Sequence, residues 1–413
     1  MRAGDSRTQT TYRFELWRAA SAGILETAGS TFLLTIAVRE FSAGAFSKAV
    51  VAGSGSLGLL ISPLVVSMVT SSGWRTSRAA AGILALGALS FFVAVAIPSL
   101  PAFVLSSVLG MAASAAVIPL LTQMYQDNYP EKERGSRFAR TVMIRIAMAA
   151  AFSKVAGDAL DGRIDQYRWL LLVFGLALAF AGFCLSRCPT DPIPRDGGTH
   201  PLRAMRFIRD DALFRRTLIC WMLMGFANLM MLPLRVDYLA NPKYHQGKPG
   251  ATVAMIALLT GVIPNLARLA LSPVWGYLFD RMNFFTLRVT LNIGFAIGIL
   301  AFFTSDSKAG LIAGAIVFGI SNAGGDVAWS LWVTKFAPPG RVADYMSVHT
   351  FLTGVRGVLA PVFAFQMVNH LSLGMLAAIS AGLIAAGTAL LVPEIKLGKK
   401  GRKGSALVEE VSD

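Results

Sequence analysis

Apolar stretches long enough to cross a membrane recur along the whole chain and alternate with short polar segments. Each covers about 18–25 residues, the length that an α-helix needs to cross ~30 Å of hydrocarbon. Gly, Ala, Ser and Thr are frequent within them, which favours close helix contacts in lipid over strands. The pattern predicts an all-α membrane protein with twelve spans, at residues 19–38, 49–70, 79–97, 102–125, 141–160, 169–186, 217–236, 251–275, 285–304, 309–333, 345–367 and 371–392.

Composition agrees with this pattern, because 54% of the residues are hydrophobic and only 15% are charged. A net charge of +15 raises the question of nucleic-acid binding, but most of the 38 Lys and Arg fall in alternate loops. That asymmetry is the positive-inside rule, so both termini are predicted in the cytoplasm. The basic clusters 131–145, 203–216 and 396–403 are expected near anionic headgroups of the bilayer, with no nucleic-acid partner. The Ala-, Gly- and Arg-rich composition favours a bacterial inner (plasma) membrane.

The N-terminal segment and the cysteines add little chemistry. The first apolar run is too long for a signal-peptide core and is interpreted as a retained span. Cys184, Cys188 and Cys220 lie in or at the ends of spans, without histidines at ligand spacing. We therefore expect no disulfide framework, no metal site and no cofactor.

Two segments of the chain repeat the same pattern about 210 residues apart. "SPLVVSMVTSSGWRTSR" runs from Ser62 to Arg78, and "SPVWGYLFDRMNFFTLR" runs from Ser272 to Arg288. A similar shift places Arg145 onto Arg356. Several matches at one offset predict two homologous six-helix halves, a common plan of secondary transporters.

The longest polar segment separates these halves and carries four prolines between residues 186 and 216. It is interpreted as a cytoplasmic linker, with a short amphipathic surface helix at about 201–213. The predicted division is an N-terminal bundle, a linker, a C-terminal bundle and a cytoplasmic tail, at residues 1–186, 187–216, 217–395 and 396–413.

The repeated segment carries a motif in its second copy, Gly276-Tyr-Leu-Phe-Asp280-Arg281 followed by Arg288. With twelve spans and a central loop, the chain resembles the major facilitator superfamily, as a bacterial-type member of unassigned substrate. In the first copy Val66 and Thr70 stand where Gly and Asp are expected. The resemblance implies two pseudo-symmetric six-helix bundles with helices 1, 4, 7 and 10 lining a central cavity. It also implies that Gly276, Asp280, Arg281 and Arg288 form a conformational motif that latches neighbouring helices in one state and releases them in another.

Charged side chains within the spans are informative, since each costs at least ~2.5–3.5 kcal/mol at the bilayer centre. The predicted spans 3, 6, 9 and 12 carry none in their cores and are expected to face lipid. The charges lie in spans 1, 5, 8, 10 and 11, at Glu26, Arg145, Lys154, Asp158, Arg268, Asp326 and Arg356.

Span 10 places polar side chains on one helix face, because Asn322, Asp326, Trp329 and Ser330 follow i, i+4, i+7 and i+8 spacing. The functional interpretation is that this face lines a hydrated cavity. The structural alternative is that Asp326 pairs with an arginine of a neighbouring span to hold the bundle together.

Arg356 lies close to mid-depth in span 11 and shares a face with His349 and Thr353. Its guanidinium is suited to bidentate binding of a carboxylate or phosphate in the substrate, or else it neutralises Asp326. His349 satisfies a local hydrogen bond or shuttles protons.

Two further substrate-binding candidates lie in spans 7 and 8. Arg268, one turn after Pro264 and beside Asn265, has the same two interpretations as Arg356. Asn228 in span 7 either coordinates substrate or caps a helix break near Pro233.

Glu26 in span 1 is a candidate proton-coupling carboxylate, since burial raises the pKa of a glutamate towards physiological pH. The alternative is a salt bridge to Arg145. Lys154 and Asp158 are spaced i,i+4 in span 5, which predicts an intrahelical ion pair, with a cavity role as the alternative.

Together these features predict a monomeric transporter that moves a small polar solute by alternating access, driven by protons. The candidate charges in the spans sum to slightly positive, which favours an anionic or zwitterionic solute. No GxxxxGK[ST] nucleotide-binding loop occurs in the chain. An efflux pump for hydrophobic drugs or lipid-like compounds is the alternative, and a polytopic membrane enzyme or lipid scramblase is less favoured because His, Glu and Asp do not cluster.

Overall fold

The structure is a computed structural model that describes residues 3–193, 205–305, 307–335, 337 and 342–398. Nearly all of these residues are helical. Part of the predicted linker 187–216, and residues 399–413 of the predicted tail, lie outside the described residues.

The membrane-crossing helices coincide with the predicted spans. Within the described ranges, 11 helices are long and apolar enough to cross a membrane. The predicted fifth span corresponds to α7 (Glu131–Leu160), whose 30 residues are long enough to cross a membrane. It is not one of the 11 because it carries more charged residues than they do. The prediction of twelve helices in an all-α membrane protein is confirmed.

Contacts divide the chain into two compact units, Met1–Gly198 with Val236–Val262, and Thr199–Arg235 with Ile263–Asp413. We call them unit 1 and unit 2. Unit 1 contains the first six spans together with a segment from the junction of spans 7 and 8. The predicted boundary between the halves, at residues 187–216, stays a prediction.

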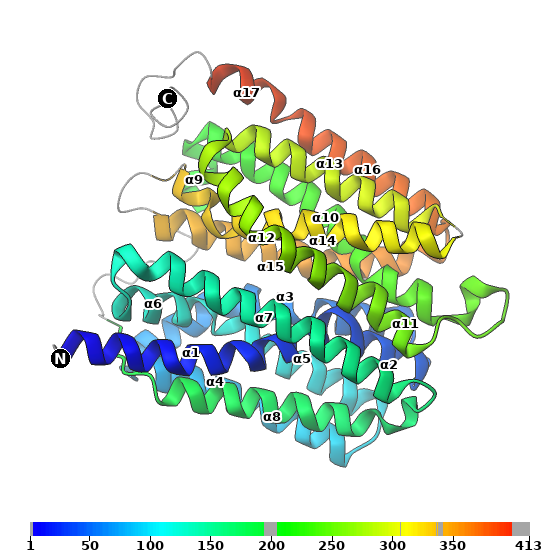
Figure 1. Ribbon diagram of the computed structural model, residues 1–413, viewed down its shortest axis with the longest axis horizontal. Helices are drawn as coiled ribbons and strands as arrows, with labels where there is room; N and C mark the ends of the chain where they lie inside the picture. The colour runs from blue at the N-terminus through cyan, green and yellow to red at the C-terminus, as the bar shows by residue number, and fades with distance from the viewer. Residues whose placement is uncertain (1–2, 194–204, 306, 336, 338–341, 399–413) are drawn as a thin grey trace. The chain divides into compact units, whose positions relative to one another are not determined.

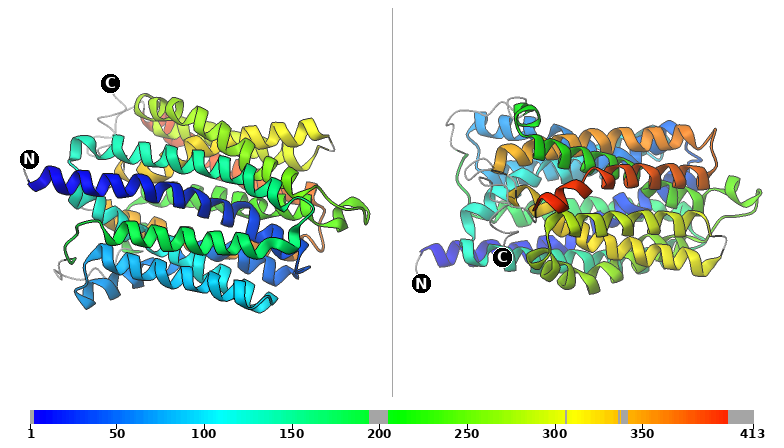
Figure 2. Two further views of the ribbon diagram at one scale, coloured as in Figure 1. Left: turned by 60° about the horizontal axis from the view of Figure 1, so that its bottom comes forward. Right: turned by 90° about the horizontal axis from the view of Figure 1, so that it is seen from above.

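Unit 1 is a bundle in which α1 packs against both α7 and α8 (Figure 2), while α4 packs against α5 and α8 and α3 packs against α5. Its elements are α1 (Ala3–Thr27), η1 (Ala28–Phe32), α2 (Leu33–Arg39), α3 (Ala45–Ser72), α4 (Thr76–Ala96), α5 (Leu100–Ala116), α6 (Ile118–Asn128), α7, η2 (Ile164–Gln166), α8 (Tyr167–Ser186), the end of α10 (Ala212–Ala240), η4 (Pro242–His245), α11 (Val253–Ala257) and η5 (Leu258–Val262).

Unit 2 is built around α14, which packs against α12 and α13, and α13 in turn packs against α16 (Figure 1). Its elements are α9 (Arg206–Asp210), α10 as far as Arg235, α12 (Ile263–Arg281), α13 (Phe284–Phe303), α14 (Lys308–Leu331), η6 (Trp332–Lys335), α15 (Val342–Met367), α16 (Leu373–Ala389) and α17 (Val392–Gly398).

Polar side chains and one glycine set the helix ends at the loops. Gly73 adopts a left-handed conformation, with φ of 69°, and ends α3. Asn283 accepts hydrogen bonds from the backbone N–H groups of Phe285 and Thr286 at the start of α13, and Ser307 caps α14 in the same way. These caps satisfy N–H groups that the helix itself leaves unpaired.

Two π-helical segments interrupt spans 1 and 8, at η1 and η5. They meet within unit 1, where the hydroxyls of Thr31 and Thr260 lie 2.9 Å apart. Gly261 lets α7 approach η5 closely, because a Cβ there would collide with Ser153 of α7. A π-turn inserts one residue into an α-helix and often marks a functional position.

Candidate transport site

Arg268 of α12 and Asp326 of α14 form an ion pair in unit 2, with Nε 2.5 Å from Oδ2. Only 9% of the arginine side chain is exposed, against 38% of the aspartate side chain. Arg268 also donates to the side-chain oxygen of Asn265 at 3.3 Å. The pair therefore joins two of the sequence candidates and leaves the carboxylate partly open.

Small residues on α14 bring the two helices close enough for this pair. A Cβ at Gly319 would collide with the backbone of Pro264 on α12. One turn further along, a Cβ at Gly324 would meet the ring of Trp275. Asn322 is half-buried on the same helix. The glycines of the "GISNAGGD" stretch thus serve close helix packing.

Arg356 of α15 reaches α10, where its Nη1 donates to the backbone carbonyl of Trp221. Gly225 makes room for it, since a Cβ at that position would overlap the guanidinium. Trp221, Gly225 and Asn228 follow one another at i, i+4 and i+7 on α10, so they share a face. The side-chain oxygen of Asn228 has no hydrogen-bond partner among the described residues.

His349 lies fully buried between three tryptophans, with ring-centroid distances of 5.3 Å to Trp221, 5.6 Å to Trp329 and 5.0 Å to Trp332. Neither of its ring nitrogens has a hydrogen-bond partner within the described ranges. His349 is thus adjacent to Trp329, another sequence candidate.

Arg288 of α13 lies in the same region, fully buried, with its guanidinium carbon 3.6 Å from the ring centroid of Trp221. The thiol of Cys220 lies nearby, without a hydrogen bond to the guanidinium. The contact with an aromatic face is a cation–π interaction. The family resemblance placed Arg288 in the conformational motif. Nothing in that motif predicted its contact with Trp221.

The other motif residues lie at the end of α12. Gly276 has open space around it, and Arg281 donates to the hydroxyl of Tyr277 at 2.5 Å. The side chain of Asp280 lies outside what the structure describes.

Unit 1 brings together Glu26 of α1 and Arg145 of α7, whose side chains pair at 3.1 Å and stay 26% and 35% exposed. Lys154 and Asp158 of α7 pair with each other at 2.5 Å and are at least half exposed. Each candidate cation of unit 1 therefore has a carboxylate partner. Arg145 reaches from span 5 to span 1, as Arg356 reaches from span 11 to span 7, which agrees with the sequence repeat.

A further ion pair in unit 1, absent from the sequence candidates, joins Lys48 of α3 to Asp237 of α10. Nζ lies 2.8 Å from Oδ1, and the two side chains are 6% and 0% exposed. Tyr244 donates its hydroxyl to the other carboxylate oxygen at 3.0 Å. Burial raises the pKa of Tyr244, so that its hydroxyl stays protonated and remains a donor. Arg39 adds a hydrogen bond to the backbone carbonyl of Ala251 at 2.6 Å.

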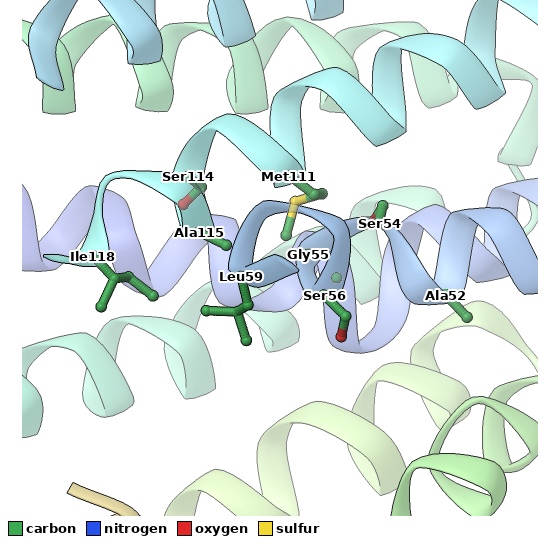
Figure 3. A pocket seen from close by; sticks show the side chains of 10 residues that line it. Ala52, Ser54, Gly55, Ser56, Leu59, Met111, Ser114, Ala115 and Ile118 are labelled. Atoms are coloured by element: carbon green, nitrogen blue, oxygen red, sulfur yellow. The ribbon is translucent and has the colours of Figure 1, made fainter. Parts of the chain in front are cut away.

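A groove of about 310 Å³ lies between α3 and α5 of unit 1 (Figure 3). Ser54, Ser56 and Ser114 contribute hydroxyls, and Met111 and Gly29 complete one wall. No charged residue lines it. Its lining suits the uncharged part of a small polar molecule better than an ion.

The sequence pattern described as "Major Facilitator Superfamily" matches residues 19–361. The chain belongs to the Major Facilitator Superfamily. It is therefore a multi-pass integral membrane protein of a family of secondary transporters.

Solved structures with the same fold include nucleoside transporter NupG, at a TM-score of 0.70 and 13% identity, covering 94% of this chain and 99% of that one. The D-xylose-proton symporter matches at a TM-score of 0.66 and 15% identity, covering 94% of this chain and 96% of that one. The human organic anion transporter MFSD10 matches at a TM-score of 0.63 and 15% identity, covering 95% of this chain and 100% of that one. Comparison with curated protein sequences gives no match. At these identities the likeness shows the fold alone.

Proposed function

We propose that this member of the superfamily is a proton-coupled secondary transporter of a small anionic solute. The observation that carries the proposal is an excess of buried cations in unit 2. Among the described residues, Arg288 and Arg356 have no carboxylate partner, whereas Arg268 has Asp326. A buried guanidinium without a counter-charge is costly, so a negatively charged solute would find compensation ready for it.

The anionic character follows from the chemistry of arginine. Its planar guanidinium offers several N–H groups in a fixed fork that matches carboxylate and phosphate oxygens. In this proposal Arg356 is the main ligand, Asn228 and Asn322 contribute amide groups, and Trp329 covers the solute. One structural neighbour is an organic anion transporter, which supports this choice.

Proton coupling is assigned to Glu26. Its carboxylate faces Arg145 at 3.1 Å and is partly exposed, so both water and the cation reach it. Protonation would remove the negative charge and release Arg145 from the pair. A change of this kind in one pair lets proton binding bias the conformation of the bundle.

Alternating access requires contacts that hold one end closed and then break. The pair between Lys48 and Asp237 is the candidate, since it fastens the end of α10 to α3 inside unit 1. Arg39 and the paired π-helices hold the rest of residues 236–262 to the first six spans. With both termini in the cytoplasm of a bacterial cell, as the basic loops indicate, this end would face outward.

The test is uptake into proteoliposomes that contain the purified monomer, with and without an inward proton gradient. The solutes are radiolabelled carboxylates and phosphorylated metabolites, with neutral sugars, nucleosides and a hydrophobic dye for comparison. We expect saturable, gradient-stimulated uptake of an anionic solute by the natural protein and a loss of at least ~10-fold in Arg356→Gln.

Arg216→Gln is the matched control, because Arg216 is also an arginine of unit 2, on α10, but its side chain is 56% exposed and paired with Glu394. It should retain uptake. Transport confined to neutral solutes or to the dye would overturn the anionic class, and full uptake by Arg356→Gln would overturn the site.

A further inference from the structure

The interior of unit 2 contains a cluster of unpaired hydrogen-bond donors around Trp221, which we name the donor cluster. Its members come from α10, α13 and α15 and are buried. They are Trp221, Arg288, Thr353 and Arg356.

The atoms without a hydrogen-bond partner in the described part of the chain are nearly all donors. They are the indole N–H group of Trp221, the three guanidinium nitrogens of Arg288 and Nε of Arg356. An indole N–H and a guanidinium can only donate. The hydroxyl of Thr353, which can also accept, is unpartnered as well.

The cluster is compact. The guanidinium of Arg288 lies over the ring of Trp221, and that ring is 5.7 Å from the ring of Trp332. Arg356 contacts the backbone of Trp221. His349 contacts both tryptophans and adds two further unpartnered nitrogens.

Acceptors are scarce in the same region. The amide oxygens of Asn228 and Asn292 are unpartnered, but both are neutral. Of the unit 2 carboxylates whose side chains the structure describes, Asp326 pairs with Arg268, Glu394 with Arg216 and Asp211 with Tyr345, and Asp210 is exposed. Among the described residues, two positive charges thus lie among donors with no acceptor of opposite charge.

Unsatisfied buried polar groups call for a missing partner, and the type of group identifies that partner. A species that only accepts, carries negative charge and takes bidentate hydrogen bonds fits donors of this kind. Water accepts as well but leaves both charges uncompensated. We infer that the donor cluster is an oxyanion subsite, in which Arg288 and Arg356 together bind a carboxylate or phosphate group.

This inference rests on the proposed function and deepens it, because it names the part of the solute that is recognised and adds Arg288 as a ligand. Thr353 and Arg356 are the most exposed members, at 7% and 9%. They mark the side from which the oxyanion would enter, and His349, one turn before Thr353 on α15, contacts Trp329 of α14.

The experiment is an equilibrium titration of the purified protein in detergent, followed by tryptophan fluorescence. The probes are sodium phosphate, sulfate and acetate, each against sodium chloride at constant ionic strength. Three of the seven tryptophans, Trp221, Trp329 and Trp332, lie at the cluster or beside it. We expect a saturable change with at least one oxyanion, and a loss of this change in Trp221→Phe.

Arg288→Gln and Arg356→Gln should each weaken binding by about 10-fold or more, the loss expected for one charge-assisted bidentate pair. Arg216→Gln should bind like the natural protein. Arg288→Lys keeps the charge but loses the fork, so it covers the case in which the glutamine variant fails to fold, and it should bind more weakly than the natural protein.

No saturable response to any oxyanion, or an unchanged affinity in Arg288→Gln or Arg288→Lys, would overturn the subsite and leave water in the cluster. Failure of the proposed function would look different, as an absence of anion uptake into vesicles whatever the titration shows. The two measurements therefore separate the two ideas.

Discussion

Lys48 and Asp237 form the most deeply buried ion pair of unit 1, with 2.8 Å between Nζ and Oδ1. Removing one partner would leave a buried charge uncompensated, at a cost of about 3–5 kcal/mol. We therefore expect Lys48→Ala and Asp237→Asn to lower thermal stability in detergent strongly, and the double variant to lose less than the sum of the two. Lys154→Ala is the control, since its pair with Asp158 is exposed and worth at most about 1 kcal/mol. Equal losses in Lys48→Ala and Lys154→Ala would contradict the assignment.

The pair between Arg268 and Asp326 predicts a strong effect on transport. Asp326→Asn removes the counter-charge of Arg268, whose side chain is only 9% exposed. The positive charge of the arginine then faces a neutral carboxamide. Uptake should fall at least ~10-fold, because a buried charge pair with a missing partner rearranges. Glu133→Gln, which breaks an exposed pair with Arg137, should leave uptake unchanged. Natural uptake rates in Asp326→Asn would show that the pair has no part in transport.

If Glu26 couples protons to transport, replacing it should abolish proton-driven accumulation of the solute but spare solute exchange. A glutamine at this position cannot exchange a proton, so Glu26→Gln should lose accumulation driven by a pH gradient while solute counterflow continues within about 3-fold of the natural rate. The measurement compares both assays on the same vesicles. Continued accumulation against a gradient in Glu26→Gln would move the coupling role to another carboxylate.

Gly225 offers a way to move Arg356 without removing it. A methyl group at Gly225 would overlap the guanidinium, which is the flexible end of the side chain and can shift. Gly225→Ala should therefore reduce anion uptake by ~10-fold with a stability change below about 1–2 kcal/mol. Gly382→Ala on α16 is the matched control, because its Cβ meets open space, and a helical alanine there should be neutral or stabilising. If both variants transport normally, the position of the Arg356 guanidinium against α10 is unimportant for uptake.

The native cysteines predict a low background for labelling experiments. All three are buried, and burial raises the pKa of Cys188, which follows α8, to about 12. At pH 8 the reactive thiolate would be on the order of 10⁻⁴ of the total, and it would grow only as the pH rises towards 12. N-ethylmaleimide should label the native protein little at pH 8 and should label all sites after denaturation in SDS. Rapid labelling of Cys188 in the folded protein would show that this region opens.

The helices were predictable from the sequence because apolar length is a strong local signal in membranes. Even α7, whose charges exceed those of the other spans, was predicted at residues 141–160. Charge pairing was harder, since Arg268 and Asp326 lie 58 residues apart in the chain. The sequence offered both Arg356 and Arg268 as partners for Asp326, and the packing of α12 on α14 at Gly319 places Arg268 there.

Other features of the site left no trace in the sequence. Lys48 stands just before the predicted span 49–70 and was not among the sequence candidates, although its side chain is buried. The π-helices have no residue signature, because a π-turn depends on the surroundings of the helix. Trp221 and Arg288 are separated by 66 intervening residues, and nothing in the motif around Asp280 indicated that they meet.

The π-helices η1 and η5 have a mechanical consequence. A π-turn holds one residue more than the α-turns on either side, so migration of this extra residue along the chain rotates the residues it passes by about 100° while both ends of the helix stay fixed. Thr31 and Thr260, each carried on such a turn, would then swing away from one another. Spans 1 and 8 can thus change which side chains they present to each other by a local twist, with neither helix tilting as a whole.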